Sequence, residues 1–257
     1  MKKLIVILVS MFVLVACKTP VVGMQQHASF TYETVMQGQV VIGGVVSNVD
    51  ELTDLDRLRY SDIQSRAFID EHQGIKIVRV GQLLQAMGAE PYHKWLDRFM
   101  VTGVITNSDA DIVHQLFPHA RYLILSRIES HNISEKHSET ETDVADSEED
   151  REKGEFEFVR VDVSLTTSRQ MGVTMMVYDM DQQLLVWSGY ISKTESDSNS
   201  SSRTFDKHKR WSEELVAAFI DGLIQPDSNS YPAAPPEAEV LEAIFEGFAE
   251  NMPEPTK

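Results

Sequence analysis

Cysteine is almost missing from this chain of 257 residues, because Cys17 is the single one. No disulfide can therefore form within the chain, and its stability must come from a packed core. Basic residues are also few: 23 lysines and arginines stand against 40 aspartates and glutamates, which gives a formal net charge of −17. Nucleic acids and anionic lipid surfaces repel so acidic a chain, so neither is expected to bind it.

The common motifs of catalysis are missing as well. The sequence has no Gly-x-Ser-x-Gly elbow, no Gly-x-x-x-x-Gly-Lys phosphate loop, and no set of cysteines and histidines with zinc spacing. Carboxylates are so abundant that pairing any two of them as a glycosidase-like acid and base carries no information. The sequence therefore predicts no enzyme, no metal site and no cofactor.

The most informative feature that is present is the N-terminus. Two lysines precede an apolar run from Leu4 to Val15, and a small residue, Ala16, comes directly before Cys17. This order is typical of a cleavable signal peptide, and the run is shorter than the roughly 20 residues that span a bilayer. We therefore predict a signal peptide over residues 1–16.

The tetrapeptide Leu14-Val15-Ala16-Cys17 resembles the lipobox of bacterial lipoproteins. The resemblance implies cleavage between Ala16 and Cys17, a thioether from Cys17 to diacylglycerol, and an acyl chain such as palmitate on the new amine. Such a lipid anchor holds a protein at a membrane without a spanning helix. Lys18, in place of an aspartate, implies the outer membrane with the folded part in the periplasm. An ordinary secretory signal with a coincidental cysteine is the alternative. Loss of the two lysines would change the charge from −17 to −19.

Strands and helices alternate in the first half of the mature chain. Apolar β-branched runs predict strands at 39–46, 75–80 and 121–128, and helical spacing predicts helices near 55–68, 83–87, 92–99 and 109–117. Gly43-Gly44, inside the first strand, indicates a bulge or a close approach of another backbone. This order of elements is typical of an α/β layer with parallel strands.

The second half predicts a long antiparallel hairpin. Apolar residues occupy every second position over 159–165 and, with the same parity, over 171–177, which favours one long strand. A turn at 179–182 and a return strand at 184–191 complete the hairpin. A helical stripe that can cover the sheet consists of Trp211, Leu215, Phe219 and Leu223. The predicted fold class is an α/β sandwich with a mixed sheet, in one periplasmic domain.

That domain is predicted to span residues 38–225, and three further segments complete the organisation. Residues 17–37 would carry the lipidated cysteine and a tether, because they show no sustained period. An acidic loop at 132–156 and a serine-rich stretch at 192–204 should be mobile. Residues 226–257 would form a proline-rich linker and a C-terminal amphipathic helix.

The C-terminal helix has one apolar stripe, which contains Leu241, Ile244, Phe245 and Phe248. The stripe must be buried somewhere, either against the domain itself or in a groove on a partner protein. These four residues are therefore candidate partner contacts and candidate core residues at the same time.

The order of these elements, together with Val177-Tyr178-Asp179 and the stretch from Leu184 to Gly189, resembles a known lipoprotein domain. Curli-secretion-channel proteins and outer-membrane activators of peptidoglycan synthases share that domain. The resemblance implies an α/β sandwich, an outer-membrane lipid anchor, no cofactor and function through protein contacts. A secretion channel needs hairpins with alternating apolar residues toward lipid, whereas the two candidate insertions here are acidic or serine-rich.

We therefore expect a lipoprotein anchored in the outer membrane that serves as an accessory or assembly factor of an envelope machine, for cell-wall synthesis, secretion or surface assembly. Its partner would be another envelope protein or a second copy of the chain. Two other classes stay open: an envelope hydrolase that uses loop carboxylates, and a lipoprotein that binds a small ligand.

Overall fold

The computed structural model describes residues 18–145, 147–154, 158–206 and 230–255. Ala16, Cys17 and the stripe predicted from Trp211 to Leu223 lie outside these residues. The chain divides into two compact units. The first unit consists of Met1–Ser130, Gly172–Ser192 and Leu241–Lys257, and the second of His131–Met171 and Lys193–Val240.

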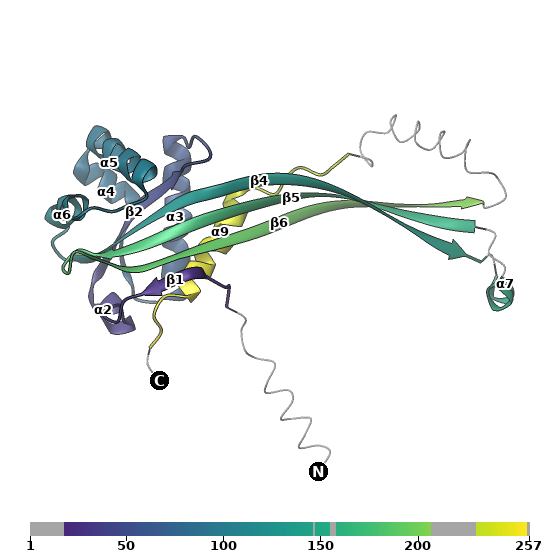
Figure 1. Cartoon of the computed structure of the whole chain (residues 1–257), viewed down its shortest axis with the longest axis horizontal. Helices are drawn as coiled ribbons and strands as arrows, with labels where there is room; N and C mark the ends of the chain where they lie inside the picture. Colours follow the sequence, from purple (N-terminus) through teal and green to yellow (C-terminus); the bar gives the residue numbers. More distant parts are fainter. Residues whose placement is uncertain (1–17, 146, 155–157, 207–229, 256–257) are drawn as a thin grey trace, which may run out of the picture. The chain divides into compact units, whose positions relative to one another are not determined.

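The strands form one mixed sheet in the order β1-β6-β5-β4-β2-β3. Their bounds are β1 (Val22–Gln26), β2 (Gln39–Ser47), β3 (Lys76–Val78), β4 (Ala120–Val144), β5 (Phe158–Asp179) and β6 (Leu184–Asp206). β2 is parallel to β3 and β4, and β1 is antiparallel to β6. Figure 1 shows β5 running opposite to β4 and β6. The predicted α/β class, with a mixed sheet and a long hairpin, is confirmed.

The helices begin and end where their terminal residues favour it. Their bounds are α2 (Tyr32–Gln37), α3 (Asp54–Glu71), α4 (Val80–Met87), α5 (Ala89–Thr102), α6 (Asn107–Leu116), α7 (Glu148–Lys153) and α9 (Glu237–Glu250). A capping box of threonine and aspartate starts both α3 and α6. Gly103 ends α5 in the left-handed conformation, with φ 63°. No helix of the described residues combines the length and the apolar character needed to cross a membrane.

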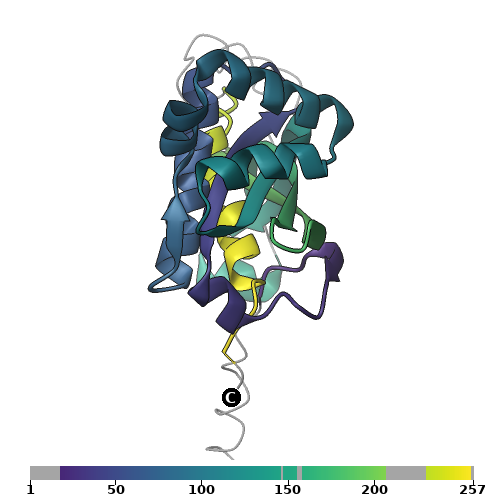
Figure 2. The same cartoon turned by 90° about the vertical axis from the view of Figure 1, so that its left-hand side faces the viewer.

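Helices pack on both faces of the sheet in the first unit. Successive side chains of a strand point to opposite faces, and β4 shows this clearly. Ser126 accepts a hydrogen bond from Gln64 of α3 at 2.8 Å, whereas Leu125 belongs to the apolar cluster that includes Trp95 of α5. Figure 1 and, turned by 90°, Figure 2 show these helices around the strands of the first unit. The result is a sandwich in which both sides of β2, and of β4 as far as Ile128, are buried.

The glycine pair in β2 forms the predicted bulge. The pairing of β2 with β4 shifts register between Ile42 and Gly44, and Gly44 has φ 141°. A Cβ atom on Gly43 would lie 2.9 Å from Cη2 of Trp95, and the Tyr92 hydroxyl donates to the Gly43 carbonyl at 3.0 Å. The close approach is therefore made by aromatic side chains of α5.

Within the tether predicted at 17–37, the described residues 18–37 contain a strand and a helix. β1 pairs with β6, and α2 begins at a capping box formed by Thr31. Phe30 and Val35 are buried, with exposed fractions of 1% and 3%. Both elements are too short to give a readable period, which is why the sequence did not reveal them.

The acidic loop at 132–156 and the serine-rich loop at 192–204 are also corrected. β4 continues to Val144, α7 follows, and β6 continues to Asp206. From Asn132 to Asp143 nearly every residue of β4 is exposed, so neither face required apolar residues. Hydroxyl pairs link β5 to β6 here, at 2.8 Å between Thr166 and Ser198 and 2.8 Å between Ser168 and Ser196.

The stripe of α9 is core and not partner surface. Leu241, Ile244, Phe245 and Phe248 have exposed fractions of 0%. The ring of Phe248 packs edge-on against Trp187 of β6, with 5.8 Å between the centroids. The sequence left open whether this helix packs on its own domain or in a groove on a partner, and in the structure it packs on its own domain. The four side chains are therefore not partner contacts.

Candidate functional site

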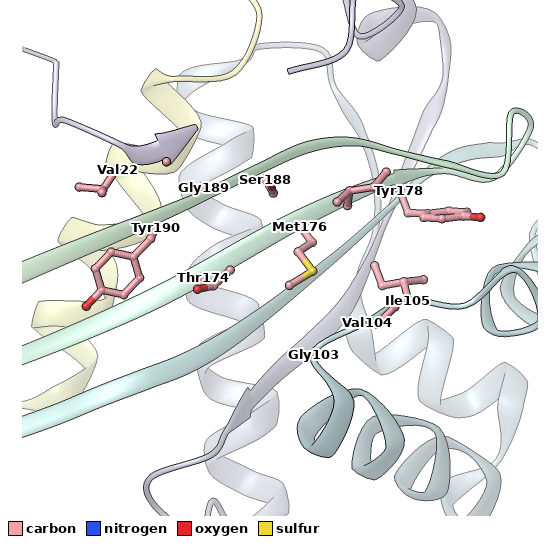
Figure 3. A pocket seen from close by; sticks show the side chains of 12 residues that line it. Val22, Gly103, Val104, Ile105, Thr174, Met176, Tyr178, Ser188, Gly189 and Tyr190 are labelled. Atoms are coloured by element: carbon pink, nitrogen blue, oxygen red, sulfur yellow. The ribbon is translucent and has the colours of Figure 1, made fainter. Parts of the chain in front are cut away.

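An apolar groove of about 520 Å³ lies over β5 and β6 in the first unit. Its floor carries Thr174, Met176 and Tyr178 of β5, together with Ser188 and Tyr190 of β6. Val22 and Gly23 of β1 line one side, and the segment after α5, Gly103 to Ile105, lines the other. Figure 3 shows side chains from all these elements around the groove. The first unit therefore offers a concave surface that is mainly apolar.

The alternation of the hairpin explains why these side chains are in the groove. In β5 the odd positions Val173, Met175 and Val177 are fully buried, so the even positions point to the opposite face. That is the face on which α4, α5 and α6 pack, since Tyr178 and Met180 belong to the same apolar cluster as the side chains of these helices. The groove thus occupies the part of that face over β5 and β6.

Glycines let the backbone and one tyrosine pack closely at the groove. A Cβ atom on Gly189 would collide with the side chain of Val21, so glycine allows the segment before β1 to lie against β6. A Cβ atom on Gly172 would collide with the hydroxyl of Tyr190, which lies 3.3 Å from the hydroxyl of Ser130. Gly172 of β5 therefore leaves room for the Tyr190 side chain to cross β5, and the hydrogen bond with Ser130 of β4 fixes its hydroxyl.

Large apolar side chains at the rim are open to solvent. Val22 is 64% exposed, Val104 57% and Leu185 42%. A single exposed valine is ordinary, but several of them around one groove mark a surface that gains from being covered. The rim therefore favours a ligand with an apolar surface.

The described lining of the groove has no histidine, carboxylate, lysine or cysteine side chain. Burial raises the pKa of Tyr178, and the carboxylates of Asp111 and Asp179 raise it further. Its hydroxyl donates to Oδ1 of Asn107 at 2.6 Å, which is the role of a neutral phenol. Among the described residues, no three histidine, cysteine, aspartate or glutamate side chains gather as a metal site would require. This described lining suits the binding of an apolar ligand, and no acid–base pair is found among its residues.

Sequence reasoning missed this groove and placed its candidate contacts elsewhere. The parity argument selected the odd positions of β5, which form the core, and assigned no role to the even positions. Met176 and Tyr178 were the available signal, because two large apolar side chains on the second face of the strand indicate a second buried or binding surface. The predicted lipidation and cleavage residues, Cys17 and Ala16, lie outside the described residues.

No protein-family model and no curated protein matches the sequence significantly. Solved structures that align with it include the lipoprotein GNA1162 of Neisseria meningitidis, at 10% identity over 75% of this chain and 99% of that one, with a TM-score of 0.34. The C-terminal domain of LpoB from Salmonella enterica aligns at 13% identity over 61% and 82%, with a TM-score of 0.33. The PelC dodecamer of Paraburkholderia phytofirmans aligns at 13% identity over 67% and 81%, with a TM-score of 0.32. Likenesses this weak do not establish a function, which has to be inferred from the residues of this chain.

Proposed function

We propose that this protein is a lipoprotein anchored in the outer membrane that acts in the periplasm by binding another envelope protein, and not by catalysis. The groove over β5 and β6 is the observation that carries the binding role, because its exposed apolar rim is costly unless a partner covers it. The lipobox-like Leu14 to Cys17 carries the anchoring role. An anchor raises the concentration of the protein near membrane partners, so a modest interface suffices.

The occupant we propose is an extended apolar segment of the partner. β1 lies at one end of the sheet order, and among the described residues no further strand pairs with its outer side. An added strand could therefore pair with β1 and place alternate side chains in the groove. The shift in register after Val22 limits that pairing to the last residues of β1. Side-chain burial in the groove must then supply most of the affinity.

The charge of the chain restricts the partner further. The described groove is lined by uncharged residues, while the chain as a whole carries a formal charge of −17. An acidic segment would be repelled on approach, a neutral one would not be, and a basic one would be attracted. The partner segment is thus apolar, with neutral or basic flanks.

Site-specific photo-crosslinking in cells tests this proposal. A photoreactive residue at Val104 should capture one envelope protein through an apolar peptide, and the same residue at Leu55, which is 74% exposed on α3, should not. A synthetic copy of the captured peptide should bind the purified protein, and Val104→Glu should weaken that binding where Leu55→Glu does not. Equal capture from both positions, or a peptide that does not bind, would contradict the proposal.

A second candidate function, self-association, is favoured by the second unit. The parts of β4 and β6 in this unit are polar, and the described residues of β4 from Glu135 to Asp143 are exposed. β5, between these two strands, carries the apolar residues of this unit, and Val159 and Val161 are buried. The feature that favours self-association is therefore the long polar edge of β4, because long open edges pair readily with other strands. Light scattering on the Cys17→Ser chain without its signal peptide measures the mass directly. A monomer at all concentrations would remove this candidate, and Thr140→Pro should lower the mass of any oligomer that uses β4.

A further inference from the structure

The N-terminal end of the described chain is fixed on the C-terminal end of α9. The backbone N–H of Thr19 donates to Oε2 of Glu250 at 3.2 Å. The side-chain amide of Asn251 donates to the carbonyl of Thr19 at 2.8 Å and to that of Gly247 at 2.7 Å. We call these contacts of Thr19 with Gly247, Glu250 and Asn251 the N-terminal clamp.

The N-terminal clamp depends on close packing as well as on hydrogen bonds. A Cβ atom on Gly247 would lie 2.8 Å from Cβ of Thr19, so only glycine lets the chain lie this close to the helix. Asn251 satisfies a carbonyl of the last turn of α9, which has no partner within the helix. Lys18 adds an ion pair with Glu254, but both side chains are about half exposed and such a pair contributes little.

This clamp lies at one definite end of the first unit. The imidazole Nε2 of His72, at the C-terminus of α3, lies 2.9 Å from the carbonyl of Ala249 in α9. The C-terminal ends of α3 and α9 and Thr19 are therefore neighbours. At 1.5 Å per residue, Leu55 at the other end of α3 is about 25 Å away along the helix axis.

Covalent geometry limits how far Cys17 can be from the clamp. Only Lys18 separates Cys17 from Thr19. Even when the chain is fully extended, the Cα atoms of Cys17 and Thr19 can be at most about 7 Å apart, and any other conformation brings them closer. A flexible tether of roughly 20 residues, as predicted for 17–37, would instead have a mean reach of about 25 Å.

We infer that the lipid on Cys17 holds the first unit directly against the membrane surface, with the N-terminal clamp next to the lipid and Leu55 pointing away from it. This rests on the proposed lipidation. Val22, three residues after Thr19, lines the groove, so the β1 side of the groove also lies close to the membrane. The partner segment that enters the groove is accordingly a juxtamembrane one.

Fluorescence quenching on vesicles tests this orientation. Lipidation uses the thiol of Cys17, so one introduced cysteine is the single labelling site of the mature lipoprotein. Val22→Cys and Leu55→Cys, both at exposed positions, are labelled with an environment-sensitive fluorophore. The proteins are placed in phosphatidylcholine vesicles, which carry no net charge, with a quencher on the lipid headgroups. We expect severalfold stronger quenching at position 22 than at position 55.

A longer tether provides the matched control. A Gly-Ser linker of roughly 20 residues, inserted between Lys18 and Thr19, keeps the clamp and the residue after Cys17 but adds about 25 Å of reach. Quenching at position 22 should then fall to the level at position 55. Equal quenching at both positions in the lipidated chain without the linker would overturn this inference alone. A mature chain that carries no acyl mass on Cys17 would overturn the proposed anchoring as well.

Discussion

Arg121 and Asp179 form a forked ion pair beside the turn between β5 and β6: the guanidinium donates to Oδ2 of the carboxylate from Nε at 3.0 Å and from Nη2 at 2.9 Å. The second oxygen, Oδ1, accepts the backbone N–H groups of Asp181 and Gln182 at 3.0 and 3.1 Å. Asp179 is fully buried. The carboxylate of Asp179 therefore fixes the turn and links it to β4. Removal of Arg121 should lower the free energy of unfolding substantially.

We expect Arg121→Met to lower the free energy of unfolding by about 3 kcal/mol, because it leaves a buried carboxylate without its cation. Urea denaturation measures the change. Arg66→Met is the control, since Arg66 pairs with Asp62 at 3.4 Å with half of its side chain exposed, and a change within about 0.5 kcal/mol is expected. A similar loss of unfolding free energy in both variants would show that the buried ion pair contributes no more to stability than the exposed one.

Gly43→Ala should destabilise the protein by about 1 to 3 kcal/mol. The new methyl would lie 2.8 Å from Cδ2 of Leu125 and 2.9 Å from Cη2 of Trp95, so the core must shift to admit it. Gly81→Ala, in α4, meets nothing within 4 Å and should stabilise by roughly 0.5 to 1 kcal/mol, because alanine favours helix. The two melting temperatures should move in opposite directions, and a shared direction would contradict the packing described for β2.

Phe248→Ala distinguishes a core helix from a docking helix. Phe248 is fully buried and packs on Trp187, so its truncation should cost about 3 to 5 kcal/mol of stability in the isolated protein. Val101→Ala, at a position 78% exposed, should change stability by less than about 0.5 kcal/mol. If α9 served chiefly as a partner surface, Phe248→Ala would leave the melting temperature of the isolated protein unchanged.

Asp109 makes stability depend on acid pH. Burial alone would raise its pKa, but hydrogen bonds from Thr106 and Arg98 outweigh burial and hold the pKa below the ordinary value. The stabilisation is therefore complete above the unfolded-state pKa of about 3.9 and is lost as the pH falls through the lower folded-state pKa. Asp109→Asn removes the charge that these hydrogen bonds stabilise, so it should cost about 1 kcal/mol near neutral pH and nothing in strong acid. Parallel stability curves for the two proteins over this range would contradict the assignment.

The sequence predicts the buried strands of this fold better than the exposed ones. β2 and the core half of the hairpin were predictable because packing on their faces imposed a period, as the buried odd positions Val173, Met175 and Val177 show. The outer parts of β4 and β6 were not, since polar residues on both faces leave no hydrophobic period to detect. β1 and α2 were missed because their stability comes from contacts with distant parts of the chain, which no local pattern records.

The groove illustrates the same limit for the candidate site. Met176 and Tyr178 could have revealed an apolar surface on the second face of β5. Val22, Val104 and Leu185, however, come from three separate parts of the chain, and only the packing of β1 and of the segment after α5 brings them together. Residues that are so far apart in the chain form no local motif, so a single sequence cannot reveal the site that they build.

The N-terminal clamp also sets an order of events in the life of the protein. Its hydrogen bonds join Thr19 to residues 231 and 232 positions further along the chain. They cannot form until the ribosome has made the chain as far as Asn251 and, with export as proposed, that chain has crossed the membrane, because α9 is the surface on which Thr19 rests. With lipidation as proposed, the signal-processing and acylating enzymes therefore meet the cysteine before its neighbours are locked in place, and folding closes the site behind them.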